Sequence, residues 1–234
     1  MLLIILSMMI CVLPVQAAGK NTISKKERNA YFSRSAFIGN SIGLGLKYYA
    51  QSQKKGYLGG PKWFVQGCYS FANDSNGPAQ YRIHYKGKVC KAKDAIAASK
   101  VKRVFICMGT NDMWKDVNSV YKNYASYVNG IRKRNPEIVI YIESTPPMCS
   151  AKNRKYLNNK TIRALNRKMK QYCKQKKNVY YINIAKGMYD KSGGLKRSYS
   201  SDGYVHLNSS AYKLWMKNVT AYVNRQLYQE KLAE

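Results

Sequence analysis

Short apolar runs alternate with amphipathic segments along most of the chain. Five runs have the length and apolar content of buried strands, and they cover residues 35–39, 62–66, 101–108, 137–143 and 179–184. Five other segments repeat apolar residues every three or four positions, and they are predicted as helices over residues 44–53, 92–99, 117–134, 161–175 and from 209 onward. Strands separated by helices predict a parallel sheet with right-handed crossovers and helices on both faces.

The helix that begins at Val117 has the clearest ends. Asp116 stands where an N-cap is expected, and Asn135-Pro136 stops the helix. Its apolar residues form one stripe, which predicts that a single face of this helix is buried.

The first residues differ from the rest of the chain. Leu2 to Leu13 are almost wholly apolar, Pro14 breaks the run, and small residues follow at Ala17-Ala18. This run is shorter than the roughly 20 residues that cross a bilayer, so a cleaved export signal is favoured over a membrane anchor. We therefore expect residues 1–17 to be a signal peptide and residues 18–234 to form a single domain. The mature protein is expected to be secreted or held at the cell surface, without stable insertion in a membrane.

The composition is strongly basic. Lys and Arg number 41 against 11 Asp and Glu, which gives a formal net charge of +30. Eleven of the basic residues lie between Lys152 and Lys177, and no acid occurs from Ser144 to Tyr189. This region is interpreted either as a solvated helix face or as a docking surface for an acidic polymer. A specific nucleic-acid partner is not expected, because no nucleic-acid motif accompanies the charge.

Five cysteines follow the expected signal peptide, and an odd number leaves at least one of them unpaired. If a disulfide forms, Cys68 with Cys90 is the expected pair. No two cysteines are spaced as Cys-x-x-Cys, and the chain has only two histidines. We therefore expect neither a zinc site nor any other metal or cofactor.

Polar stretches follow three of the predicted strands and precede the last helix. Gly39-Asn40-Ser41, Gly67-Cys68-Tyr69-Ser70 and Gly109-Thr110-Asn111-Asp112 follow strands, and Asp202-Gly203-Tyr204-Val205-His206 comes before the helix. In parallel sheets covered by helices, binding sites gather at the carboxyl ends of the strands. These stretches are therefore the first place to look for a site.

Each stretch alone has a simpler interpretation. A serine at a strand-to-helix turn is often an N-cap, an Asn-Asp pair is common in turns, and a lone histidine can simply pack. Together they supply what acyl transfer requires: a hydroxyl nucleophile, an imidazole base, a carboxylate to orient it and donors for an oxyanion. The other histidine, His84, has no carboxylate near it in the sequence.

The four stretches, in this order, resemble the signature blocks of the SGNH hydrolases, also called GDSL esterases and lipases. Ser41 matches the nucleophile and Gly109-Thr110-Asn111-Asp112 matches the third block, and the similarity runs from about residue 35 to 215. The resemblance implies an α/β fold, a three-layer α/β/α sandwich around a five-stranded, mostly parallel, flavodoxin-like sheet. It also implies that Ser41, His206 and Asp202 form a catalytic triad.

The resemblance further implies an oxyanion hole built from the backbone N–H groups of Ser41 and Gly67 and the side chain of Asn111. Gly67 is preferred over Gly59 and Gly60 because it directly follows a strand, and a residue without a side chain lets its N–H approach a ligand closely.

Two positions depart from the family pattern. Asn40 stands where the family usually has Asp, and an isosteric amide is expected to preserve the local hydrogen bonding. Three residues separate Asp202 from His206 where the family usually has two. Either the loop carries an insertion, or the carboxylate approaches the ring from a different angle.

The expected function is that of a secreted serine esterase, which removes O-acyl groups, O-acetyl above all, through an acyl-enzyme intermediate. Its substrate is an acylated small molecule or a polysaccharide, and the basic surface favours an anionic one. One alternative is a noncatalytic protein that binds an anionic polymer with the same fold, and another is a lipase or thioesterase of the same family. The sequence does not indicate an oligomeric state.

Overall fold

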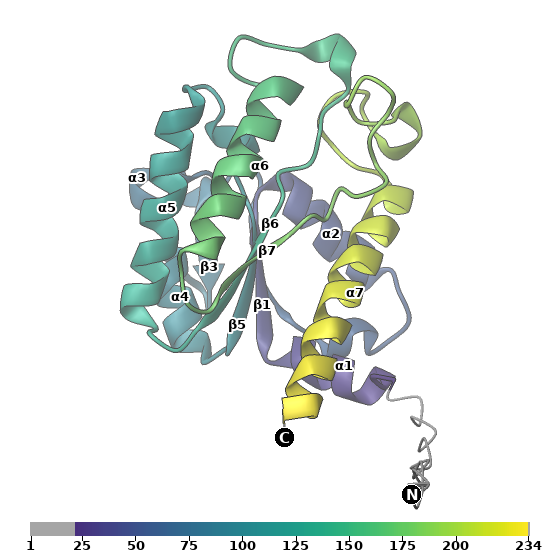
Figure 1. Cartoon of the computed structure of the whole chain (residues 1–234). Helices are drawn as coiled ribbons and strands as arrows, with labels where there is room; N and C mark the ends of the chain where they lie inside the picture. Colours follow the sequence, from purple (N-terminus) through teal and green to yellow (C-terminus); the bar gives the residue numbers. More distant parts are fainter. Residues whose placement is uncertain (1–21, 234) are drawn as a thin grey trace, which may run out of the picture.

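A computed structural model describes residues 22–233 (Figure 1). The expected signal peptide, residues 1–17, lies outside the described residues. The central sheet has the order β2-β1-β5-β6-β7, and every neighbouring pair of strands is parallel. Its strands are β1 (Ser35–Gly39), β2 (Lys62–Val65), β5 (Arg103–Cys107), β6 (Val139–Glu143) and β7 (Val179–Ile182). The predicted five-stranded sheet is confirmed.

Helices cover both faces of this sheet, as the predicted three-layer fold requires (Figure 1). One layer consists of α1 (Lys25–Ser33), α2 (Ser41–Gln51) and α7 (Ser209–Ala233). The other consists of α3 (Phe71–Asn76), α4 (Ala92–Ser99), α5 (Val117–Arg134) and α6 (Asn159–Lys174).

Alternation along the strands divides the core between the two layers. In β5, Val104 and Ile106 pack on the α4–α6 side, whereas Phe105 packs on the α1–α7 side. The ring of Phe105 stacks between Phe37 and Tyr141 of the neighbouring strands, with centroid distances of 4.8 and 4.7 Å. A strand that is buried on both faces reads as a continuous apolar run, which is why these strands were visible in the sequence.

Several helix ends follow from side-chain caps. Asp116 caps α5, because its Oδ1 accepts hydrogen bonds from the backbone of Asn118 and Ser119 at 2.9 and 3.1 Å. This cap was predicted correctly. Helix α2 begins at Ser41, three residues before the predicted start, because the Asn40 side chain caps it.

Helices α1 and α3 and one antiparallel hairpin were not predicted. Helix α1 buries only Tyr31 and Phe32, so its apolar period is weak. The antiparallel hairpin of β3 (Ile83–Tyr85) and β4 (Lys88–Cys90) consists of strands of three residues each. Such short strands leave too little pattern to detect.

The expected disulfide between Cys68 and Cys90 is wrong, since both residues are free thiols. Cys68 is exposed in the turn after β2, whereas the Cys90 thiol lies 3.8 Å from the Ile83 carbonyl oxygen across the β3–β4 hairpin. Among residues 22–233, no helix has the length and apolar content that would let it cross a membrane.

Candidate active site

The structure gathers the predicted site residues at the carboxyl ends of the strands. Ser41, Gly67 and Asn111 follow β1, β2 and β5, which are neighbours in the sheet, and His206 precedes α7. All four line one open cleft with a volume of about 740 Å³. Asp202 is hydrogen-bonded to His206 beside this cleft.

Ser41 is held at the tight turn between β1 and α2. A Cβ on Gly39 would lie 3.1 Å from the Gly43 Cα and 3.2 Å from the Cys107 carbonyl oxygen, so this bend favours glycine. The buried Asn40 then caps α2, because its Oδ1 accepts the Ile42 N–H at 3.0 Å. An amide oxygen is sufficient for this cap, as expected from the sequence. Ser41 is thus the first helical residue, and its N–H belongs to the helix end that has no intrahelical acceptors.

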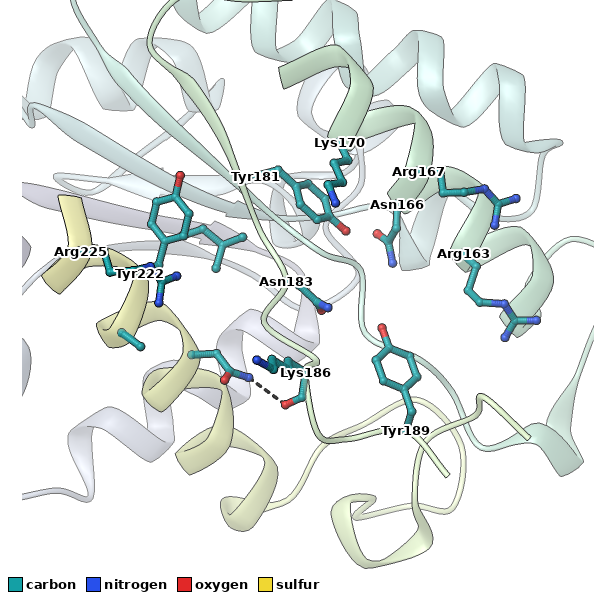
Figure 2. A pocket seen from close by; sticks show the side chains of 13 residues that line it. Arg163, Asn166, Arg167, Lys170, Tyr181, Asn183, Lys186, Tyr189, Tyr222 and Arg225 are labelled. Carbon is teal, nitrogen blue, oxygen red and sulfur yellow. Dashed lines mark hydrogen bonds between the residues drawn. The ribbon is translucent and has the colours of Figure 1, made fainter. Parts of the chain in front are cut away.

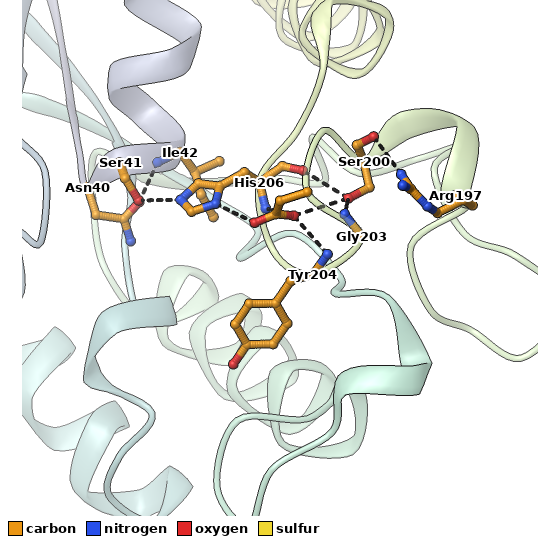
Figure 3. Close-up of polar contacts among 9 residues, drawn as sticks. Asn40, Ser41, Ile42, Arg197, Ser200, Gly203, Tyr204 and His206 are labelled. Atoms are coloured by element: carbon orange, nitrogen blue, oxygen red, sulfur yellow. Dashed lines mark hydrogen bonds and ion pairs between the residues drawn. The ribbon is translucent and has the colours of Figure 1, made fainter.

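Ser41, His206 and Asp202 form a continuous hydrogen-bonded chain (Figure 3). The Ser41 Oγ lies 3.0 Å from the His206 Nε2, and the His206 Nδ1 lies 2.6 Å from the Asp202 Oδ2. Because a carboxylate only accepts hydrogen bonds, Nδ1 carries the proton and donates it to Asp202. Nε2 of the neutral ring is then the acceptor for the Ser41 hydroxyl.

The longer spacing between Asp202 and His206 is accommodated by a turn that folds around the carboxylate. The Asp202 Oδ1 accepts the backbone N–H groups of Tyr204 and His206 at 2.7 and 3.2 Å, which leaves Oδ2 for the ring. Gly203 supplies the left-handed backbone conformation of this turn, with φ +70°. The additional residue therefore lengthens the turn while the carboxylate still meets Nδ1.

Asp202 is ionised in this arrangement. Burial raises the pKa of its carboxyl, but hydrogen bonds from the His206 ring and from the backbone of Tyr204 and His206 outweigh burial and hold the pKa below its ordinary value. A negative charge beside Nδ1 favours a protonated imidazole whenever Nε2 takes up a proton.

Two further donors line the cleft besides the Ser41 N–H at the start of α2. The Asn111 Nδ2 donates to the Tyr69 carbonyl oxygen at 3.1 Å, and an amide nitrogen has a second hydrogen for another acceptor. Within residues 22–233, the Gly67 N–H donates to no protein acceptor. Gly59 and Gly60 do not line the cleft, and Gly59 packs against Asn29 of α1 instead.

Asp112 was assigned only to turn chemistry in the sequence, and it has a larger part in building the cleft. Its Oδ1 accepts the Phe71 N–H at 2.9 Å, which ties the segment after β5 to the segment after β2. Burial raises the pKa of Asp112 to about 7. Asp112, the residue after Asn111, thereby fixes the turn that carries Gly67.

The rim of the cleft combines aromatic rings with two cations. Trp114 is 60% exposed, and Tyr156 and Tyr204 are half-buried beside it. Arg154 and Lys155 are exposed on the loop before α6, and the Arg154 guanidinium lies 5.8 Å from the centre of the Tyr204 ring. The sequence did not indicate that these five residues meet at the rim, because loop positions follow no period.

The remaining candidates for metal or base chemistry lie elsewhere. His84 is on β3, where its Nε2 lies 3.0 Å from the Ala79 carbonyl oxygen. In the part of the chain that the structure describes, no three His, Cys, Asp or Glu side chains are grouped as a metal site requires.

Comparisons with known proteins identify the family and the fold. The sequence pattern of the GDSL-like Lipase/Acylhydrolase family matches residues 38–214. No curated protein sequence matches the chain. Many solved structures do match.

A GDSL-like lipase from Bacteroides thetaiotaomicron is 16% identical, with a TM-score of 0.62 over 84% of this chain and 90% of the other. A carbohydrate esterase of family 3 from Talaromyces cellulolyticus is 15% identical, with a TM-score of 0.59 over 84% and 98%. An acetyl xylan esterase is also 15% identical, with a TM-score of 0.58 over 81% and 98%. At such low identities, the structural matches show the fold alone. The family is shown by the sequence pattern, which covers more than half of the chain. The chain therefore belongs to the GDSL-like lipase/acylhydrolase family and is a serine hydrolase that acts on esters.

Proposed function

We propose that this protein is a secreted esterase that removes O-acetyl groups from a polysaccharide, with Ser41, His206 and Asp202 as its catalytic triad. The observation that carries the proposal is the hydrogen-bonded chain between these residues, with distances of 3.0 and 2.6 Å. This is the arrangement that acyl transfer through a serine needs.

The reaction follows from the positions of these groups. His206 Nε2 takes the Ser41 proton as Oγ attacks the ester carbonyl, and Asp202 stabilises the resulting imidazolium. The N–H groups of Ser41 and Gly67 and the Asn111 amide bind the oxyanion, helped by the positive end of α2. His206 then protonates the leaving sugar oxygen, and water attacks the acyl-enzyme by the reverse sequence of proton transfers.

A sugar substrate suits the rim of the cleft. Trp114, Tyr156 and Tyr204 offer apolar rings with polar edges, on which the faces of sugar rings can pack. Arg154 and Lys155 favour a glycan that carries negative charge. Two of the structural neighbours are described as a carbohydrate esterase and an acetyl xylan esterase, which adds support for this substrate class.

Long-chain lipids suit the cleft less well. Two exposed cations stand at its mouth, and a lipase needs a broad apolar surface there to receive an acyl chain. We therefore favour a short acyl group, and acetyl is the shortest that is common on glycans.

The proposal is tested by covalent labelling with a fluorophosphonate probe. Mass spectrometry of the labelled protein should find the probe on the peptide that contains Ser41. The Ser41→Ala variant should remain unlabelled, and Ser70→Ala, which removes another serine after a strand, should be labelled like the parent. Labelling of Ser41→Ala to the same extent would overturn the assignment of the nucleophile.

The substrate class is tested separately. Acetate release from acetylated xylan and acetylated polygalacturonate is compared with hydrolysis of p-nitrophenyl palmitate at matched ester concentrations. We expect the glycans to be the better substrates. Faster hydrolysis of the long-chain ester would identify a lipase.

Secretion rests on the apolar run before Pro14 and on the small residues after it. Expression in a bacterial host and N-terminal sequencing of the exported protein should find a mature end at residue 18. Retention of the whole chain in the cytoplasm would contradict this part of the proposal.

A further inference from the structure

A second concave surface lies at the edge of the sheet, outside the active-site cleft (Figure 2). It follows β7, the last strand in the sheet order, and its walls are α6 and α7. Its volume is about 550 Å³, and none of its lining residues belongs to the cleft. We call this surface the edge groove.

Cations from three separate segments line the edge groove. They are Arg163, Arg167 and Lys170 of α6, Lys186 after β7, and Arg225 of α7. All five are exposed, and no Asp or Glu is among the lining residues. None of them takes part in the ion pairs found within residues 22–233. Positive charge that converges on a concavity without counter-charge creates a strong local attraction for anions.

This convergence favours a docking surface over a solvated helix face for the basic region. A solvated helix face would present its cations outward from one helix only. Here Lys186 and Arg225 approach the same groove from other segments, more than ten residues beyond Lys170 in each case. The groove therefore has the charge distribution of a binding surface.

Neutral donors lie between the cations. Tyr181 and Tyr189 are half-buried, and in Figure 2 their hydroxyl ends point into the groove. Burial raises the pKa of both phenols, so the hydroxyls stay protonated and can donate. The Asn183 Oδ1 accepts the Ser144 hydroxyl at 3.3 Å, which leaves its amide nitrogen as a further donor.

A line of basic residues connects the groove with the cleft. Arg163 also lines a smaller hollow at the start of α6, together with Lys160. The loop just before α6 places Arg154 and Lys155 at the rim of the cleft. A long anionic chain can therefore follow α6 from the groove to Ser41.

We propose that the edge groove is a second binding site for an anionic polysaccharide, which carries carboxylate or phosphate groups along its length. The cations bind the acid groups, and the phenols and the Asn183 amide bind sugar hydroxyls. Nucleic acid is less favoured, because no nucleic-acid motif accompanies the charge. The groove retains the polymer while its ester groups reach the cleft. Binding of the polymer by the groove does not depend on the esterase activity, whereas its retention for the cleft rests on the proposed function.

The test measures binding in the Ser41→Ala background, so that no ester is consumed. The probe is a fluorescent oligogalacturonate of about ten sugars, and a phosphodiester-linked sugar oligomer of similar length tests phosphate in place of carboxylate. A neutral xylo-oligosaccharide of the same length is the uncharged reference. The groove variant is Arg167→Ala/Lys186→Ala/Arg225→Ala. Its matched control, Lys102→Ala/Lys122→Ala/Lys133→Ala, removes three exposed charges that do not line the groove, two from α5 and one from the segment before β5.

We expect the groove variant to weaken binding of at least one anionic oligomer by about tenfold or more, since charge-assisted hydrogen bonds are lost. The control should change the affinity less than twofold, and the groove variant should show a shallower dependence of affinity on salt. With Ser41 intact, the same groove substitutions should leave hydrolysis of p-nitrophenyl acetate unchanged, which shows that the variant is folded.

Three results would overturn the proposal. The first is that the groove variant binds both anionic oligomers as tightly as the parent does. The second is that the groove variant and its control weaken binding equally. The third is that the parent binds the neutral oligomer, or single-stranded oligo(dT) as a further probe, as tightly as it binds the anionic glycans. Because p-nitrophenyl acetate hydrolysis is measured separately, failure of the groove and failure of the proposed esterase function remain distinguishable.

Discussion

The cleft and the edge groove are built on opposite electrostatic principles. In the cleft, Asp202 and His206 satisfy each other at 2.6 Å, and backbone N–H groups complete the bonding of the carboxylate. In the groove, five cations share a concavity without an acid. Charge is compensated inside the protein where a fixed geometry is needed for chemistry. It is left uncompensated where the ligand supplies the opposite charge.

The largest effect expected on this comparison comes from Asp202→Asn. An asparagine cannot stabilise the imidazolium and favours the wrong tautomer of His206, so kcat should fall by about 10⁴-fold. The measurement is p-nitrophenyl acetate hydrolysis. Asp94→Asn, which changes a partly exposed carboxylate paired with Arg134, should retain the parent rate. An Asp202→Asn variant with undiminished kcat would show that charge compensation in the cleft is unimportant.

A smaller loss is expected from Asn111→Ala. Removal of one oxyanion donor typically lowers kcat by about 10²- to 10³-fold. The same substitution removes the hydrogen bond to the Tyr69 carbonyl oxygen, so thermal unfolding is measured in parallel. Asn123→Ala on the exposed side of α5 is the control. Equal rates for the two variants would remove Asn111 from the oxyanion hole.

Trp114→Ala tests whether the rim recognises sugar. We expect KM for an acetylated oligosaccharide to rise by about three- to tenfold, as for the loss of one aromatic contact. The rate with p-nitrophenyl acetate should hardly change, because this small ester does not reach the rim. Tyr48→Ala removes an equally exposed ring on α2 and should leave both substrates unaffected. A parallel loss with both esters would point to a structural role for Trp114.

The smallest effect concerns stability and contrasts the ionised Asp202 with a carboxyl in the core. Glu143 is buried, accepts the Trp215 indole N–H at 2.9 Å, and has its pKa raised by burial to about 8. Between pH 4.5 and 8 the unfolded chain loses this proton while the folded protein keeps it. The free energy of unfolding therefore falls as pH rises through this window.

Glu143→Gln removes that pH dependence. The melting temperature of the variant minus that of the parent should be higher at pH 8 than at pH 5, by an amount on the order of 5 °C. Glu137→Gln, at an exposed carboxyl, should show no such difference between the two pH values. If the melting temperatures of the parent and Glu143→Gln differ by the same amount at pH 5 and at pH 8, Glu143 is already ionised in the folded protein.

The sheet was predictable because its strands are buried on both faces and leave continuous apolar runs, as in β5. Helix α1 was not, since only Tyr31 and Phe32 of its nine residues are buried. The more apolar surface a helix or strand buries, the more easily it is predicted from the sequence.

Strand ends in this fold converge and few residue types perform acyl transfer, which drew attention to Ser41, Asn111 and His206, and the resemblance to the SGNH hydrolases supplied their roles. Trp114 and Tyr156 were not, since loop conformation decides which side chains reach the rim. The edge groove was only half visible. Sequence shows the charge near α6, but the contribution of Arg225 depends on the packing of α7 against the same edge.

The ion pair between Glu27 of α1 and Lys231 of α7 has a practical consequence for orientation. It joins the first and last helices, which lie side by side near the amino ends of the strands (Figure 1). The cleft lies at the carboxyl ends of the strands, where Ser41, Gly67 and Asn111 follow β1, β2 and β5. A tether attached beside either of these residues would hold the protein with its reactive mouth directed away from the support. Immobilised in this way, the molecule would scan a soluble or gel-like polymer freely, and attachment through the rim loops would block it.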